Sequence, residues 1–227
     1  MHQDNPDITN LIELRGRIAG EFSFSHEVYG EGFYNFTVEA PRLSEASDFL
    51  PVTISERLID GMDLKPGTMV DIAGQVRSYN NYVQEANKNR LIITVFAREI
   101  EVLADEDIIN KNPNSVCLSG FICKKPVFRQ TPFGREIADI LLAVNRSYNK
   151  SDYVPCICWG RNAKFASTLE VSDNVKISGR LQSRIYQKKY EDGTAEDKTA
   201  YEISVSKIEF VNKDMNHCEN AKRKKRV

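Results

Sequence analysis

Val175-Lys176-Ile177-Ser178-Gly179-Arg180-Leu181 alternates apolar and polar side chains and carries one glycine in its middle. Strict alternation predicts a β-strand with one buried face, and a glycine inside such a strand predicts a bend or bulge. The segment Tyr201–Ile208 alternates in the same way, and Glu191-Asp192-Gly193 between the two segments is a turn signal. The sequence therefore predicts a long β-hairpin in this region.

The first strand of this hairpin has a counterpart early in the chain. Val175–Gly179 matches Val70-Asp71-Ile72-Ala73-Gly74, and three further segments match in the same order at offsets that grow from 104 to 108: Leu14–Ile18 with Leu118–Ile122, Leu50–Val52 with Val154–Cys156, and Ile100–Val102 with Ile208–Phe210. Slowly growing offsets are expected when two copies of one domain differ in loop length. An ordered series of four matches predicts an internal repeat.

Each copy spans about 100 residues, close to the usual size of a small domain. The second copy contains one candidate short helix, over residues 162–170, where Ala163, Phe165, Ala166 and Leu169 are apolar. The order of three strands, a short helix and a long hairpin is that of the OB-fold, a five-stranded Greek-key barrel. The sequence predicts an all-β protein of two tandem OB-fold domains with a short helix in each.

Composition changes mark the expected boundaries. Asp105-Glu106-Asp107 and Asn112-Pro113-Asn114 form a polar connector. We expect an N-terminal arm over residues 1–10, a first domain over 11–104, a linker over 105–113, a second domain over 114–212 and a disordered basic tail over 213–227. No apolar run approaches the roughly 20 residues of a membrane span, and Met1–Asn10 is too polar for a secretory signal. These features predict a soluble, cytoplasmic protein without a membrane partner.

Charge is distributed unevenly over the two copies. Residues 1–113 contain 10 lysines and arginines against 19 aspartates and glutamates, whereas residues 114–227 contain 21 against 13. The whole chain has a net charge of only −1. This asymmetry predicts that the two copies do not share the binding of a polyanion equally.

Neither the cysteines nor the other polar motifs indicate a metal site or an enzyme. The five cysteines contain no Cys-x-x-Cys pair, and the three histidines are scattered. Cys156 and Cys158 lie two residues apart on one strand face, which predicts small buried core residues, with a zinc site as the minor alternative. The chain contains no Gly-x-x-x-x-Gly-Lys, no His-Glu-x-x-His and no carboxylate–histidine set, so we expect no cofactor and no catalysis.

Four stretches of the second copy carry a family pattern: Lys125–Gly134, Leu142–Tyr148, Cys156–Gly160 and Val175–Tyr186. On these residues, the region 114–211 resembles the bacterial single-stranded DNA-binding proteins. The resemblance implies an OB-fold that binds single-stranded DNA without reading its sequence, in replication, recombination or repair. It implies stacking aromatics at Tyr148, Tyr153, Trp159 and Tyr186.

Physical chemistry supports this candidate site independently of the family. Every base has a π-face, so stacking on aromatic side chains captures single strands at roughly 1–3 kcal/mol per base. Strand aromatics are more often core residues and surface cations more often only solvated, which is the alternative for each residue singly. Beside the aromatics, the candidate set contains Phe128, Arg129, Arg146, Arg161, Lys164, Arg184, Lys188 and Lys189.

The first copy keeps the framework of the second but loses most of these aromatics. Ser44 aligns with Tyr148 and Ser55 with Trp159, and only Phe49 remains opposite Tyr153. Together with its acidic charge, this loss predicts a scaffold that holds an oligomer together or meets a protein partner. A weaker contribution to DNA binding remains open, through Arg15, Arg17, Arg77 and Tyr82, with Tyr79 or Tyr82 as a loose counterpart of Tyr186.

The paired domains predict a homodimer that presents four barrels. The family typically ends in an acidic tip that recruits replication and repair enzymes, whereas this chain ends Ala221–Val227 with five basic residues. The opposite charge puts that route to protein partners in doubt, and a basic tail gathers DNA non-specifically. The alternatives are a primosome-type replication accessory, an RNA-binding OB module and a purely structural oligomer.

Overall fold

The computed structural model describes residues 9–42, 44, 46–83, 88–104, 113–189 and 193–211. Strands follow the alternating segments, and two short helices interrupt them. The first half contains β1 (Asn10–Ile18), β2 (Ser23–Val28), β3 (Glu31–Pro41), β4 (Ser47–Ser55), α1 (Glu56–Ile59), β5 (Met69–Val83) and β6 (Lys88–Val102). The second half repeats this order as β7 (Asn114–Ile122), β8 (Val127–Gln130), β9 (Glu136–Arg146), β10 (Lys150–Trp159), α2 (Arg161–Ala166), β11 (Asn174–Lys189) and β12 (Ala195–Phe210).

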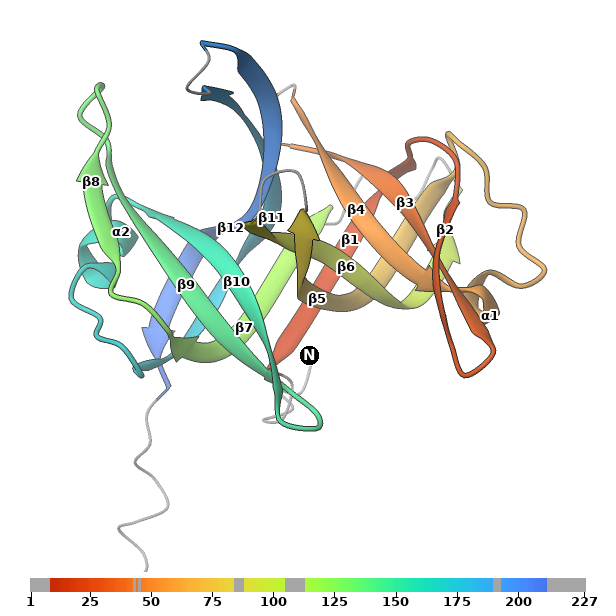
Figure 1. Ribbon diagram of the computed structural model, residues 1–227, viewed down its shortest axis with the longest axis horizontal. Coiled ribbons are helices and arrows are strands. Elements are labelled where there is room, and N and C mark those ends of the chain that lie inside the picture. The colour runs from red at the N-terminus through yellow and green to blue at the C-terminus, as the bar shows by residue number, and fades with distance from the viewer. Residues whose placement is uncertain are drawn as a thin grey trace, which may run out of the picture.

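Each half closes into a barrel. In the first, β1 pairs with both β3 and β5, and the circuit is completed by β3–β4, by the parallel pair β4–β6 and by β6–β5. In the second, β7, β9, β10, β12 and β11 pair in the corresponding order, again with one parallel pair, β10–β12. The two barrels lie side by side (Figure 1). The expected all-β fold with two OB-like barrels is confirmed.

Alternation along each strand fills the barrels with aliphatic side chains. In β7 every second residue is buried, and Leu118, Leu142 and Ile177 are fully buried in the second barrel. Cys156 and Cys158 belong to the same core, as predicted from their spacing. Burial raises the pKa of the Cys158 thiol to about 12, so this side chain is a neutral apolar group at neutral pH.

The glycine of the opening segment lies at an irregularity of the β11–β12 ladder. The register shifts between Ser178 and Gly179, and a Cβ atom on Gly179 would lie 2.2 Å from the carbonyl oxygen of Ser204. Gly74 occupies the corresponding bulge of the first barrel, where a Cβ would lie 2.4 Å from the Phe96 carbonyl oxygen. The predicted bend is therefore present, and close backbone approach requires glycine at both sites.

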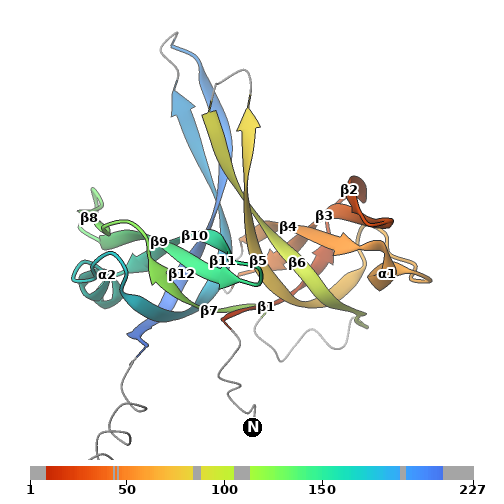
Figure 2. The ribbon, with the colours of Figure 1, turned by 60° about the horizontal axis from the view of Figure 1, so that its bottom comes forward.

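Two long hairpins, β5–β6 and β11–β12, extend from the barrels in the same direction (Figure 2). Arg90 of the first hairpin donates to the backbone carbonyl of Thr199 in the second, at 3.4 Å. Helix α2 is shorter than the expected 162–170, and the following residues to Leu169 form a turn that still buries Leu169. None of the helices in the described part of the chain has the length and apolarity that crossing a membrane requires.

The predicted arm, linker and basic tail lie almost wholly outside the described residues, which include only Thr9, Asn10 and Pro113 of these three segments.

Candidate nucleic-acid interface

A row of three side chains crosses the outer face of the second barrel. Trp159 at the end of β10 pairs with Ile137 of β9, which pairs with Arg129 of β8. Residues paired directly across a ladder point to the same side of the sheet. Trp159 is 40% exposed, whereas Ile137 beside it is buried. This row therefore presents one large aromatic surface with a guanidinium at its edge.

Two tyrosines continue this surface along β10. Tyr153 lies six residues before Trp159, so strand alternation places it on the same face, and it is half-exposed. Tyr148 lies in the turn between β9 and β10 with a backbone φ of 62°, and the residue is 94% exposed. A tyrosine held in the left-handed region with its ring in water has no packing role in the barrel, which favours a binding role.

Tyr186 lies further away, on the β11–β12 hairpin. The guanidinium of Arg184 lies 5.6 Å from the centre of its ring, and the same guanidinium pairs with Glu202 at 3.4 Å. The Tyr186 ring remains 39% exposed. Arg184 thus orients the ring while leaving part of it open for stacking.

Most of the candidate cations have acidic partners. Arg129 pairs with Asp139 at 2.8 Å, and Lys164 pairs with Glu136 at 3.2 Å. These pairs are exposed, so an incoming phosphate can compete with the carboxylate at little cost. The remaining candidates lie as follows: Arg161 is exposed at the start of α2, Phe128 is half-exposed on the side of β8 opposite to Arg129, Lys188 is half-buried on β11, and the Lys189 side chain lies outside the described residues.

The two barrels join through an antiparallel ladder between β1 and β7. Its register pairs Asn10 with Leu118, Ile12 with Val116 and Leu14 with Asn114. Adding 104 to the residues of the first barrel and subtracting 104 from those of the second converts each pair into another pair of the same ladder. The two barrels are therefore related by a pseudo-two-fold axis through the Ile12–Val116 pair, in the way that the two subunits of a symmetric dimer are related.

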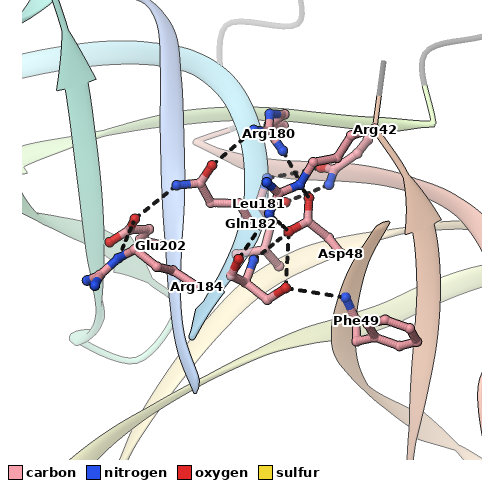
Figure 3. Close-up of polar contacts among 10 residues, drawn as sticks. Arg42, Asp48, Phe49, Arg180, Leu181, Gln182, Arg184 and Glu202 are labelled. Atoms are coloured by element: carbon pink, nitrogen blue, oxygen red, sulfur yellow. Dashed lines mark hydrogen bonds and ion pairs between the residues drawn. The ribbon is translucent and has the colours of Figure 1, made fainter. Parts of the chain in front are cut away.

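A buried aspartate of each barrel holds the other barrel. Asp48 of β4 is 1% exposed and receives hydrogen bonds from Arg42 Nε at 2.8 Å, from Arg180 Nη1 at 2.9 Å and from the backbone N–H of Ser183 at 2.7 Å (Figure 3). Burial alone would raise the pKa of Asp48, but the bonds from Arg42 and Ser183 outweigh it and hold the pKa below its ordinary value. Arg180 and Ser183 belong to β11, so this carboxylate links the barrels.

Asp152 repeats this contact on the other side of the axis. Its fully buried carboxylate accepts from the backbone N–H of Ser78 at 2.7 Å and pairs with Arg146 at 3.1 Å and with Arg77 at 3.4 Å. The hydroxyl of Ser78 accepts from the backbone N–H of Tyr153 at 2.7 Å. Arg146, a candidate from the sequence, is therefore also a structural contact, and the first barrel positions the strand that carries Tyr153.

Sequence reasoning missed these two aspartates, although a signal was present. Asp48 and Asp152 are separated by 104, the offset of the repeat, and so are Arg42 and Arg146. A charged pair that recurs at the repeat offset in otherwise apolar strands indicates a shared structural contact. Among the described residues, no group of three or more histidine, cysteine, aspartate or glutamate side chains is arranged to hold a metal ion.

The chain is similar to known proteins in sequence and in fold. The model of the Single-strand binding protein family matches residues 113–211. Single-stranded DNA-binding protein 2 of Chlorobaculum tepidum is 36% identical over 110 residues, which cover 44% of this chain and 72% of that protein. The protein of the same name from Listeria innocua is 30% identical over 115 residues, covering 48% and 69% respectively. The single-stranded DNA binding protein from Thermus aquaticus superimposes with a TM-score of 0.71 at 18% identity, covering 92% of this chain and 95% of that chain, so the likeness in fold extends over both barrels.

Proposed function

The chain belongs to the single-strand binding protein family, and we propose that its second barrel binds single-stranded DNA independently of sequence, in replication, recombination or repair. The observation that supports this most is the outer side of β10 and its preceding turn, where Trp159, Tyr153 and Tyr148 are 40%, 44% and 94% exposed. Binding DNA would bring the protein to the nucleoid.

The proposed mechanism needs no bond making or breaking. Bases stack on the indole and phenol rings, and stacking is indifferent to base identity because it uses the π-face rather than the hydrogen-bonding edge. Phosphates replace the carboxylate partners of Arg129 and Lys164 and reach Arg161, which is exposed beside Trp159. Since each neutralised phosphate releases counterions, affinity falls with added salt.

The test uses the single tryptophan of the chain, Trp159. Titration with oligo-dT is expected to quench its fluorescence to saturation, because a base stacks on the indole. The logarithm of the binding constant should fall linearly with the logarithm of the salt concentration, by about 0.7 for each phosphate contacted. An unquenched tryptophan at saturating DNA would refute the proposal, and tighter binding of an equally long oligo-rU would indicate RNA as the ligand.

We also propose that two chains associate, giving four barrels in the assembly. The twelve-stranded sheet ends at β2 and β8, whose outer edges pair with no strand within the described residues. Open edges of this kind are common sites of strand addition. Light scattering under DNA-binding conditions should return about twice the chain mass of 25.8 kDa; a mass equal to one chain would contradict the proposed dimer.

A further inference from the structure

Three guanidinium groups gather where the barrels meet. Arg77 of β5, Arg98 of β6 and Arg146 of β9 line two neighbouring cavities, of about 280 and 630 Å³. The smaller cavity reaches Ser147, directly before the exposed Tyr148, and the larger one extends over the first barrel. Burial together with the charges of Arg146 and Arg98 lowers the pKa of Arg77, although the carboxylate of Asp152 acts in the opposite direction. Asp152 pairs with Arg77 and Arg146, so one carboxylate faces three cations and an anion bound here would be attracted to the remaining positive charge.

The opposite side of the pseudo-two-fold axis lacks this excess of charge. There Arg42 and Arg180 surround Asp48 as Arg146 and Arg77 surround Asp152, but Ser206 stands where the first barrel has Arg98. Both residues lie at the bulge of their hairpin, opposite Gly179 and Gly74 respectively. Arg98 therefore adds a cation on one side of the axis only. The contact between the barrels does not depend on such a cation, because Asp48 makes the same contact on the other side without one.

The first barrel also carries aromatic side chains on its outer face, at positions different from those in the second barrel. In the second barrel, the outer row across three strands is Trp159, Ile137 and Arg129. The corresponding row of the first barrel is Ser55, Phe33 and His26. The aromatic side chain of this row thus lies on β10 in the second barrel but on β3, the counterpart of β9, in the first. The imidazole of His26 stacks on the Phe33 ring with 4.9 Å between centres and 7° between planes.

A further ring joins this row from β6. Phe96 lies 5.8 Å from Phe33, and the guanidinium of Arg98 lies 5.3 Å from the centre of the Phe96 ring. Tyr79, 53% exposed, lines the same 630 Å³ cavity as His26 and Phe96. Although the first copy is acidic as a whole, none of the described residues that line this cavity is an aspartate or glutamate. The cavity thus combines aromatic surface with unbalanced positive charge.

We propose that this cavity of the first barrel is a second binding site for single-stranded DNA, with bases stacked on His26, Tyr79 and Phe96 and a phosphate held by Arg98. The inference rests on the proposed function of the second barrel, because the two cavities share Arg77, Arg98 and Arg146 and so extend from Ser147, the neighbour of Tyr148, to Phe96. A strand that leaves the second barrel at Tyr148 continues across the three guanidinium groups onto the first barrel. This proposal takes up the DNA contribution that the sequence left open for the first barrel, and the expected scaffolding role stays a prediction beside it.

The test separates the two barrels by oligonucleotide length. An OB barrel occupies about 4–16 nucleotides, so an oligo-dT of about 8 nucleotides fits one barrel and one of about 30 spans both. Trp159 fluorescence reports the second barrel, and the anisotropy of a labelled oligonucleotide reports total binding. The variants are His26→Ala, Arg98→Ala and their combination, all at exposed positions, so that the fold is retained. Lys65→Ala, an exposed cation of the first barrel away from this cavity, is the matched control.

The double variant should bind the long oligonucleotide about tenfold more weakly, since one stacked base and one phosphate are lost. Arg98→Ala alone should reduce the magnitude of the salt slope by about 0.7, and Lys65→Ala should leave both unchanged. Quenching of Trp159 by the short oligonucleotide should match the wild type in every variant.

Three outcomes would overturn the inference. Long-oligonucleotide affinity and salt slope equal to those of the wild type, with Trp159 still quenched, would show that only the second barrel binds. If Arg98→Ala weakened the quenching of Trp159 by the short oligonucleotide as much as it weakened the binding of the long one, Arg98 would act on the second barrel instead. A wild-type protein whose Trp159 is not quenched by either oligonucleotide would refute the proposed function, and this inference with it.

Discussion

Asp48→Ala is expected to lower the free energy of unfolding by about 3 kcal/mol, because it removes the shared partner of two cations and an amide at the junction of the barrels. The carboxylate is buried and receives bonds from Arg42, Arg180 and Ser183. Its loss leaves both guanidinium groups without a counter-charge and the Ser183 amide without its acceptor. Both arginines retain some exposure to water, which places the cost toward the lower end for a broken buried ion pair.

The stabilisation by the Asp48 carboxylate should decrease as the pH is lowered. Because the pKa of Asp48 is lower in the folded state than its ordinary value of 3.8, the carboxylate stabilises the fold fully above that value. The contribution is lost as the pH falls through the folded-state pKa. Urea denaturation of wild type and Asp48→Asn should therefore differ most near neutral pH and converge in strong acid.

Asp63→Ala is the matched control, since Asp63 pairs with Lys65 at 2.9 Å in a fully solvated part of the same barrel. Exposed pairs contribute little, so this variant should lose less than about 1 kcal/mol. Equal losses for Asp48→Ala and Asp63→Ala would mean that the buried carboxylate does not hold the barrels together.

Trp159→Ala should weaken the binding of oligo-dT by roughly 1–3 kcal/mol, or between about fivefold and more than a hundredfold, as expected when one stacked base is lost. The indole is partly exposed at the end of β10, and its loss leaves Ile137 and the barrel core in place. The variant should therefore keep its melting temperature within a few degrees while its affinity falls. Anisotropy of a labelled oligonucleotide measures the affinity, because the variant has no tryptophan.

Three further variants separate the loss of stacking from a general loss of surface. Trp159→Phe keeps an aromatic ring and should recover most of the affinity, whereas Val171→Ala, which truncates an exposed apolar side chain elsewhere in the barrel, should bind as the wild type does. Ser55→Ala, at the repeat-related position, should also leave DNA affinity nearly unchanged. Ser55 caps α1 by accepting from the backbone N–H of Arg57, so its effect should appear in stability instead. If Trp159→Ala and Val171→Ala had the same affinity, stacking at Trp159 would be excluded.

Much of the fold could be predicted because strand alternation and glycine placement are local properties of the chain. The segment Val175–Leu181 predicted a bulged strand, and the bulge lies at Gly179, where the backbone of Ser204 leaves no room for a side chain. Cys156 and Cys158 were correctly expected in the core, since positions two apart on a strand share a face. The stacking positions of the second barrel came from the resemblance to the family, and their binding role stays a prediction.

The sequence by itself determined two barrels and their order of elements, because these depend on near neighbours and on a repeat that can be read by alignment. Only the tertiary structure decided how the barrels join and what the first barrel presents. Alignment at a fixed offset compares Trp159 with Ser55 and finds a loss, whereas the ladder shows that Phe33 lies directly across from Ser55 on the same face. A binding face is a property of neighbouring strands, and side chains far apart in the chain meet there only after the barrel has closed.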